Sequence, residues 1–128
     1  MIKRTMLPIS VVLALAGVMS LAGFANAGSL ADSTVTIKAQ SGDFSGTISS
    51  SRPMRCAQDR KVVVFKQVGA NQDPSQDDRV ASDTASLSGD RYEWSTGNTG
   101  VYGKVYARVG RTEHCKADTS RTVRSVRP

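Results

Sequence analysis

The sequence predicts an all-β fold, a single Ig-like β-sandwich of about seven strands that follows a signal peptide. Short runs of alternating apolar and polar residues recur between residues 35 and 126. Clusters rich in Gly, Ser, Asn and Asp separate these runs about every 8–15 residues, a spacing typical of β-sandwiches. No stretch after residue 27 shows apolar residues at helical spacing, so helices contribute little to the predicted fold.

The N-terminus has the three parts of a secretory signal peptide, which we assign to residues 1–27. Lys3 and Arg4 supply positive charge, residues 7–24 are mostly apolar, and small residues flank Asn26. This order predicts export, with cleavage after Ala27, to the periplasm or the medium. The alternative is an uncleaved membrane anchor, but the apolar run is of marginal length and a proline and a glycine interrupt it.

Cleavage leaves 101 residues, which is one domain, and we divide them into a flexible lead-in (28–34) and a β-sandwich (35–128). We expect no transmembrane segment here, because no second apolar run follows the signal. Fifteen basic and eleven acidic residues remain, a net charge of +4, which is weaker than the basic stripe of a nucleic-acid-binding domain. Residues 71–93 are predominantly acidic, and residues 111–128 are predominantly basic.

Alternation places the individual strands. They are expected at residues 35–40, 44–49, 61–68, 79–82, 91–95, 101–109 and 122–126, and loops are expected at 50–60, 69–78 and 110–120. Residues 61–68 are β-branched and apolar on both faces at the centre of the run, which predicts an interior strand. Tyr92 and Trp94 share one face of their strand, and we expect both in the core.

The mature chain has two cysteines, Cys56 and Cys115. An even number of cysteines in an exported protein predicts a disulfide, and two cysteines allow one intramolecular pairing. Closing a loop of about 60 residues restricts the unfolded state by roughly 4 kcal/mol in the chain-entropy model. A reactive thiol is the alternative, since His114 precedes Cys115, but adjacent residues of a strand point to opposite faces.

Four motifs follow one another in a characteristic order. They are a Gly-containing strand at 44–48, an Arg-Lys-Val-x-Val-Phe type strand at 60–65, a stretch from Asp83 to Trp94 that contains Gly89 and Tyr92, and a Gly-x-Tyr strand at 100–107. With one Cys before the second strand and another before the last, the order resembles that of transthyretin-like (prealbumin-like) modules, also called carboxypeptidase-regulatory-like domains, in small exported bacterial proteins. The resemblance implies a β-sandwich with a structural or binding role and no shared catalytic residues.

The chain lacks most of the groups that catalytic and metal sites require. His114 is its single histidine, and no Gly-x-Ser-x-Gly motif marks a serine nucleophile. Zinc ligands are too few once both cysteines are paired. A weak calcium site is an open alternative at four acidic residues, Asp73, Asp77, Asp78 and Asp83, whose default interpretation is solvated loop carboxylates. We therefore expect a protein that is not an enzyme and that uses no cofactor.

Aromatic and basic side chains near the C-terminus are the candidate binding residues. Tyr102 and Tyr106 alternate with small apolar residues, so we expect an exposed tyrosine pair beside Arg108. Three further arginines follow in the basic tail: Arg121, Arg124 and Arg127.

Three functions are open at this point. The first is a non-enzymatic exported module that binds or stabilises an unknown protein or glycan in the bacterial envelope or outside the cell. The second is a polyanion-binding protein that uses the basic tail on nucleic acid, anionic glycan or lipopolysaccharide. The third is a small secreted enzyme or inhibitor.

Overall fold

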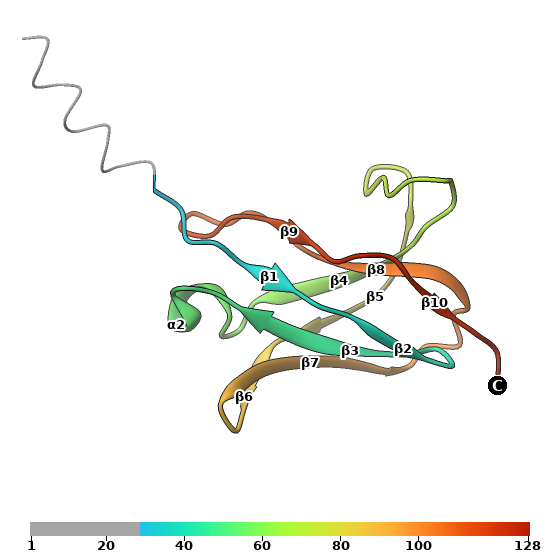
Figure 1. The fold of residues 1–128 in the computed structure, drawn as a ribbon, viewed down its shortest axis with the longest axis horizontal. Helices are drawn as coiled ribbons and strands as arrows, with labels where there is room; N and C mark the ends of the chain where they lie inside the picture. The colour runs from blue at the N-terminus through green and yellow to red at the C-terminus, as the bar shows by residue number, and fades with distance from the viewer. Residues whose placement is uncertain (1–28) are drawn as a thin grey trace, which may run out of the picture.

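The computed structural model describes residues 29–128, which form two antiparallel β-sheets that face each other in a sandwich-like arrangement (Figure 1). The predicted signal peptide, 1–27, lies outside the described residues. Ten short strands and one short helix make up the described part, so the all-β expectation is confirmed. Within these residues no helix is long and apolar enough to cross a membrane.

The first sheet is built around two long strands, β3 (Asp43–Ser49) and β7 (Arg91–Asn98), which pair with each other. β1 (Thr34–Val35) and β2 (Lys38–Gln40) pair in turn with the free edge of β3. β6 (Ser86–Ser88) pairs with the other edge of β7. The strand expected at 35–40 is therefore divided into two, because residues 36 and 37 interrupt the regular strand, although the Thr36 amide still donates to the carbonyl of Thr47 (3.0 Å).

The second sheet has β4 (Lys61–Lys66) and β8 (Gly103–Val109) at its centre. β5 (Asp78–Thr84) pairs with β4, and β9 (Asp118–Thr119) and β10 (Val123–Ser125) pair with β8. β4 thus has a neighbour on each side, as its continuous apolar run predicts. β9 corrects the expectation that residues 110–120 form only a loop.

The core lies between the sheets and takes every second residue of the main strands. Phe44, Ile48 and Trp94 enter it from the first sheet. The second sheet contributes Val62, Val64, Val105, Ala107 and Val109. Trp94 is confirmed as a core residue, and Tyr92 packs against the core while remaining partly exposed.

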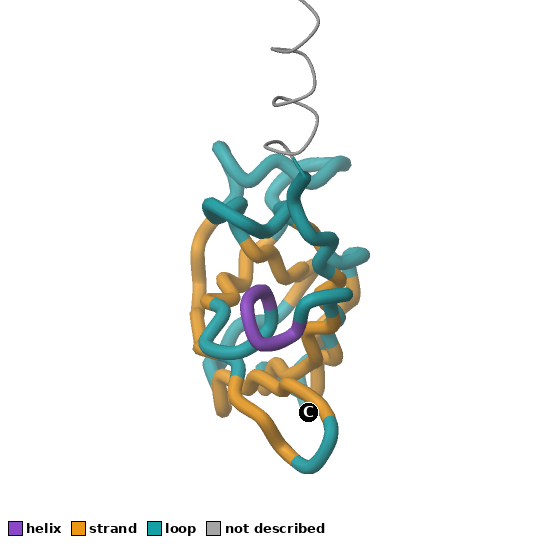
Figure 2. Tube along the Cα trace, turned by 90° about the vertical axis from the view of Figure 1, so that its left-hand side faces the viewer, coloured by secondary structure: helices purple, strands orange, loops and turns teal. Residues whose placement is uncertain are grey.

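The segment 50–60, which we expected to be a loop, contains the helix α2 (Pro53–Cys56). Pro53 stands in its first turn, where the missing N–H costs nothing and the fixed φ suits a helix. Figure 2 views the molecule from the end that carries α2, with strands behind it.

Within the lead-in predicted at 28–34, the described residues include Ala31, which is hydrogen-bonded to the domain. The amide of Ala31 donates to the carbonyl of His114 (2.9 Å), and the amide of Lys116 donates to the carbonyl of Ala31 (2.8 Å). Strand β1 then begins at Thr34. The partner lies far away in the sequence, so local composition did not reveal this anchoring.

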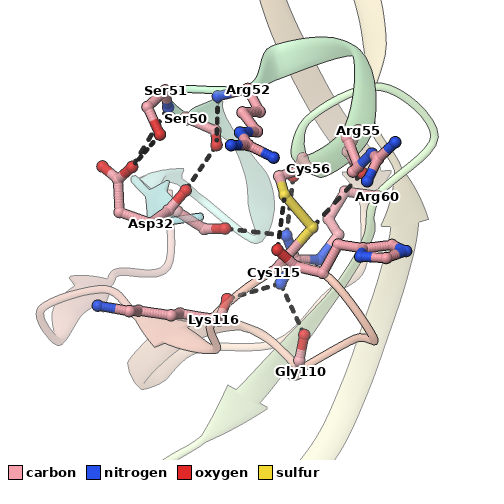
Figure 3. Close-up of a disulfide and its surroundings, with 12 residues drawn as sticks. Asp32, Ser50, Ser51, Arg52, Arg55, Cys56, Arg60, Gly110, Cys115 and Lys116 are labelled. Carbon is pink, nitrogen blue, oxygen red and sulfur yellow. Dashed lines mark hydrogen bonds between the residues drawn. A yellow bond between two sulfur atoms is a disulfide. The ribbon is translucent and has the colours of Figure 1, made fainter. Parts of the chain in front are cut away.

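The disulfide between Cys56 and Cys115 is confirmed (Figure 3). It joins the last residue of α2 to the segment between β8 and β9, and both cysteines are buried. The alternative of a reactive thiol beside His114 is therefore wrong for this structure.

Arg60 lies beside the disulfide and makes four hydrogen bonds to three other chain segments (Figure 3). Nη1 donates to Ser33 Oγ (3.0 Å) and to the carbonyl of Cys56 (2.8 Å). Nη2 donates to the carbonyls of Gly110 (2.7 Å) and Lys116 (2.9 Å). Desolvation by burial lowers the pKa of this guanidinium from its ordinary value. An arginine keeps its charge despite such a shift, so the buried cation is stabilised by the carbonyl dipoles but keeps its positive charge.

Candidate anion-binding face

The surface of the second sheet that points away from the core is called the basic face here, after Lys104, Arg108 and Arg124. Val105, Ala107 and Val109 point into the core, so the alternate residues of β8, Lys104 and Arg108 among them, point to the basic face. Arg124 on β10 is the direct cross-strand partner of Lys104. Two cations therefore stand opposite each other, with Cβ atoms about 5 Å apart.

A second contact adds Tyr102 and Arg127 to the same end of β8. The guanidinium carbon of Arg127 lies 4.8 Å from the centre of the Tyr102 ring, a cation–π contact. Tyr102 is half-buried under this arginine. Arg121 is exposed in the link between β9 and β10. The structure thus brings Tyr102, Lys104, Arg124 and Arg127 near one another. Of these, Lys104 was not predicted from the sequence.

Tyr106 is fully buried, which corrects the expectation that it forms an exposed pair with Tyr102. Its ring stacks on Phe65 with the ring centres 5.4 Å apart, and its hydroxyl donates to Asp77 Oδ2 at 2.5 Å. Asp77 ends the loop 67–77, which folds over this part of the basic face. The Tyr106 ring is buried although it points away from the core, so both sides of β8 are covered at this point.

Asp77 is the hydrogen-bond acceptor that holds this loop. Its Oδ1 accepts the amide of Val68 (3.0 Å), and its Oδ2 accepts the amide of Asp73 (2.8 Å) in addition to the Tyr106 hydroxyl. The hydrogen bond from Tyr106 is the main cause that lowers the pKa of the Asp77 carboxyl, and the two amides add to it. Burial, followed by the bond to Asp77, raises the pKa of Tyr106.

Arg108 is half-buried on the basic face beside Val63, its cross-strand partner on β4. Its Nη1 donates to Thr119 Oγ1 at 2.8 Å. This bond is to a neutral hydroxyl, so the charge of Arg108 is not neutralised by it.

Cations on the basic face lack acidic partners. Across residues 29–128, the single ion-pair contact within 4.0 Å joins His114 to Glu113, at 3.8 Å. All 15 lysines and arginines of this part of the chain therefore stand without a carboxylate at ion-pair distance. Arg124 is exposed, whereas Lys104 and Arg108 are half-buried, and Lys104 Nζ donates to the carbonyl of Gly69 (2.9 Å). Adjacent cations without carboxylate partners attract anions and raise their local concentration.

The acidic residues considered for calcium do not come together. Asp77 is engaged by three donors, and Asp83 Oδ2 accepts the amide of Ser95 on the other sheet (2.7 Å). No group of three His, Cys, Asp or Glu side chains within residues 29–128 is arranged to hold a metal ion. His114 is exposed, with Glu113 as its charged contact.

No protein-family model matches this chain, and no curated protein matches its sequence.

Proposed function

We propose that the chain is an exported, non-enzymatic binding module that holds an anionic glycan on its basic face. The observation that carries the proposal is the direct opposition of Lys104 and Arg124, neither of which has a carboxylate within 4.0 Å. Like charges placed directly opposite on a ladder destabilise a sheet, and a bound anion relieves that repulsion. The transthyretin-like type is retained within the proposal, supported by the resemblance of the sequence motifs and the two-sheet architecture.

A glycan is favoured over nucleic acid by charge and by compartment. The net charge of +4 is modest, and an exported protein meets envelope and extracellular polymers first. Sulfate, phosphate and carboxylate groups share the chemistry that arginine recognises, namely paired oxygens that accept two N–H donors. The half-buried Tyr102 ring, which contacts Arg127, places an aromatic side chain next to those donors.

The proposal is tested by retention on an immobilised sulfated polysaccharide, with heparin as the probe, at increasing NaCl. We expect the variant Arg124→Ser/Arg127→Ser to bind about 3- to 30-fold more weakly, which is the range expected for loss of two exposed charge contacts. Binding of the unaltered protein should fall steeply as salt rises.

The matched control is Lys38→Ser/Arg91→Ser, which removes two exposed cations from the outer side of the first sheet. Equal loss in both double variants would show that net charge, not the basic face, governs retention. Retention that persists unchanged in high salt would exclude an electrostatic site. Tighter retention on immobilised single-stranded DNA than on heparin would assign the face to nucleic acid.

The export part of the proposal has its own test, which is intact mass of the natively exported protein. We expect a chain that starts at Gly28, with alkylation of Cys56 and Cys115 after reduction and none before. A mass that includes residues 1–27 would contradict export by a cleaved signal.

A further inference from the structure

A second group of cations surrounds an open cleft at the other end of the basic face. The cleft has a volume of about 430 Å³ and lies where β4 begins, next to the turn that follows β8. Lys61, Arg79 and Arg111 line it and are exposed, and Val63 contributes apolar surface. Asp59 is the one acidic residue of the lining.

Arg60 also lines this cleft, and its buried guanidinium makes the site more than a group of surface charges. The side chain is 6 % exposed, and four of its five N–H groups donate to Ser33 and to three carbonyls. No carboxylate of residues 29–128 lies within ion-pair distance of it. A buried cation without a counter-ion raises the positive potential of the adjoining cleft, because screening by water is weak there.

The rim that carries Arg111 is held in place by bonds to its flanking backbone. Arg60 donates to the carbonyl of Gly110 on one side and to that of Lys116 on the other. The amide of Thr112 donates to the carbonyl of Cys115 (3.0 Å), and Cys115 is covalently joined to α2. Ordering this turn beforehand reduces the entropy lost when a ligand binds.

We propose that this cleft binds a phosphate or sulfate group, and that it is the subsite for the charged substituent of the glycan, an assignment that rests on the function proposed above. Four cations and one carboxylate give the lining an excess of three positive charges. A tetrahedral dianion accepts hydrogen bonds from several directions. Because the cations of the cleft lie on β4, β5 and the 110–112 turn, their arrangement suits such an anion better than a planar carboxylate. The cleft volume leaves room for the sugar unit that carries the group.

The experiment is a titration of ¹⁵N-labelled mature protein with inorganic phosphate and, separately, inorganic sulfate, followed by amide shifts. We expect the amides of Val63, Arg111 and Thr112 to move in a saturable way, with Kd in the millimolar range for so small a probe. Arg111→Ser and Lys61→Ser should each weaken this binding at least about 3-fold, in the range for a charge contact at a partly exposed site. Both side chains are exposed, so the thermal midpoint should stay unchanged.

The control is Arg124→Ser/Arg127→Ser, which should leave phosphate binding at the cleft unaltered. Amide shifts that do not saturate up to about 50 mM phosphate, or that arise beside Lys104 and not beside Val63, would overturn the cleft assignment. Heparin retention without phosphate binding would refute the cleft and leave the proposed function standing. Saturable phosphate binding at the cleft, without heparin retention, would refute the glycan function and leave an anion site.

Discussion

The hydroxyl of Tyr106 donates a 2.5 Å hydrogen bond to Oδ2 of Asp77, a residue 29 positions earlier in the chain. This bond ties the end of the loop 67–77 to β8, where the Tyr106 ring stacks on Phe65. Because of this bond, the ionisation of the Tyr106 hydroxyl and that of the Asp77 carboxyl affect each other.

We predict that stability falls at both ends of the pH range because of this pair. The folded-state pKa of Asp77 is lowered, so its contribution is complete above the ordinary carboxyl value near 3.9 and is lost as pH falls below it. Asp32, whose pKa Ser51 lowers through its hydroxyl and amide, acts in the same direction. The folded-state pKa of Tyr106 is raised, so its contribution is complete below about pH 10 and is lost as pH rises further.

Urea unfolding at a series of pH values measures this dependence. Asp77→Asn should reduce the loss of stability at acid pH. Tyr106→Phe should reduce the loss of stability at alkaline pH and should also lower the urea midpoint at neutral pH. Tyr102→Phe is the matched control, because Tyr102 contacts Arg127 through its ring face. If stability fell as steeply at alkaline pH in Tyr106→Phe as in the unaltered protein, the role given to Tyr106 would be contradicted.

Arg60 supports a different prediction, a large loss of stability when its guanidinium is removed. Arg60→Met leaves Ser33 Oγ and the carbonyls of Cys56, Gly110 and Lys116 without this donor. Each unsatisfied buried acceptor costs about 1–3 kcal/mol, so we expect at least about 3 kcal/mol in chemical denaturation. Arg60→Lys should recover part of this, because an ammonium offers three donors without the planar fork.

Arg55→Met is the control for Arg60, since Arg55 is exposed on α2 close to the same disulfide. A loss in Arg60→Met no larger than that in Arg55→Met would show that the four bonds contribute little.

Gly46 should not tolerate a side chain. A Cβ at this position would lie 1.9 Å from the carbonyl oxygen of Thr36 and 2.8 Å from Nε1 of Trp94. The first contact is with backbone, so the strand must shift, and overpacking of this kind costs about 1–3 kcal/mol or more. Gly69→Ala is the matched control, because nothing lies within 4 Å of its Cβ position. Equal thermal midpoints for the two variants would refute this packing argument.

The disulfide should contribute stability and also order the cleft. Reduction, or Cys56→Ser/Cys115→Ser, should cost roughly 4 kcal/mol in the chain-entropy model, because the linked residues are 59 positions apart. Phosphate affinity at the cleft should fall as well, since the turn that carries Arg111 loses its covalent anchor. Unfolding in urea and the amide titration measure the two effects separately. Unchanged urea midpoints after reduction would show that the hydrogen bonds of Arg60 and Ala31 suffice to hold this turn.

The sequence by itself determined the β architecture and the cysteine pairing. Alternation at 44–49 and 103–109 reports which residues share a face, because the side-chain period of a strand is two. The apolar centre of the strand predicted at 61–68 indicated neighbours on both sides, and β4 has them. Two cysteines in a chain with a predicted signal peptide allowed one pairing, and that pairing is present.

Only the tertiary structure decided which surfaces remain exposed. Tyr106 follows the same alternation as its neighbours on β8, yet it is buried because the loop 67–77 covers it, and that loop is distant in sequence. The opposition of Lys104 and Arg124 depends on strand register, and the cleft depends on three segments that meet around Arg60. A local pattern assigns a residue to one face of a strand. Long-range hydrogen bonds and packing then decide which segment covers that face. The basic face could therefore be identified only from the tertiary structure.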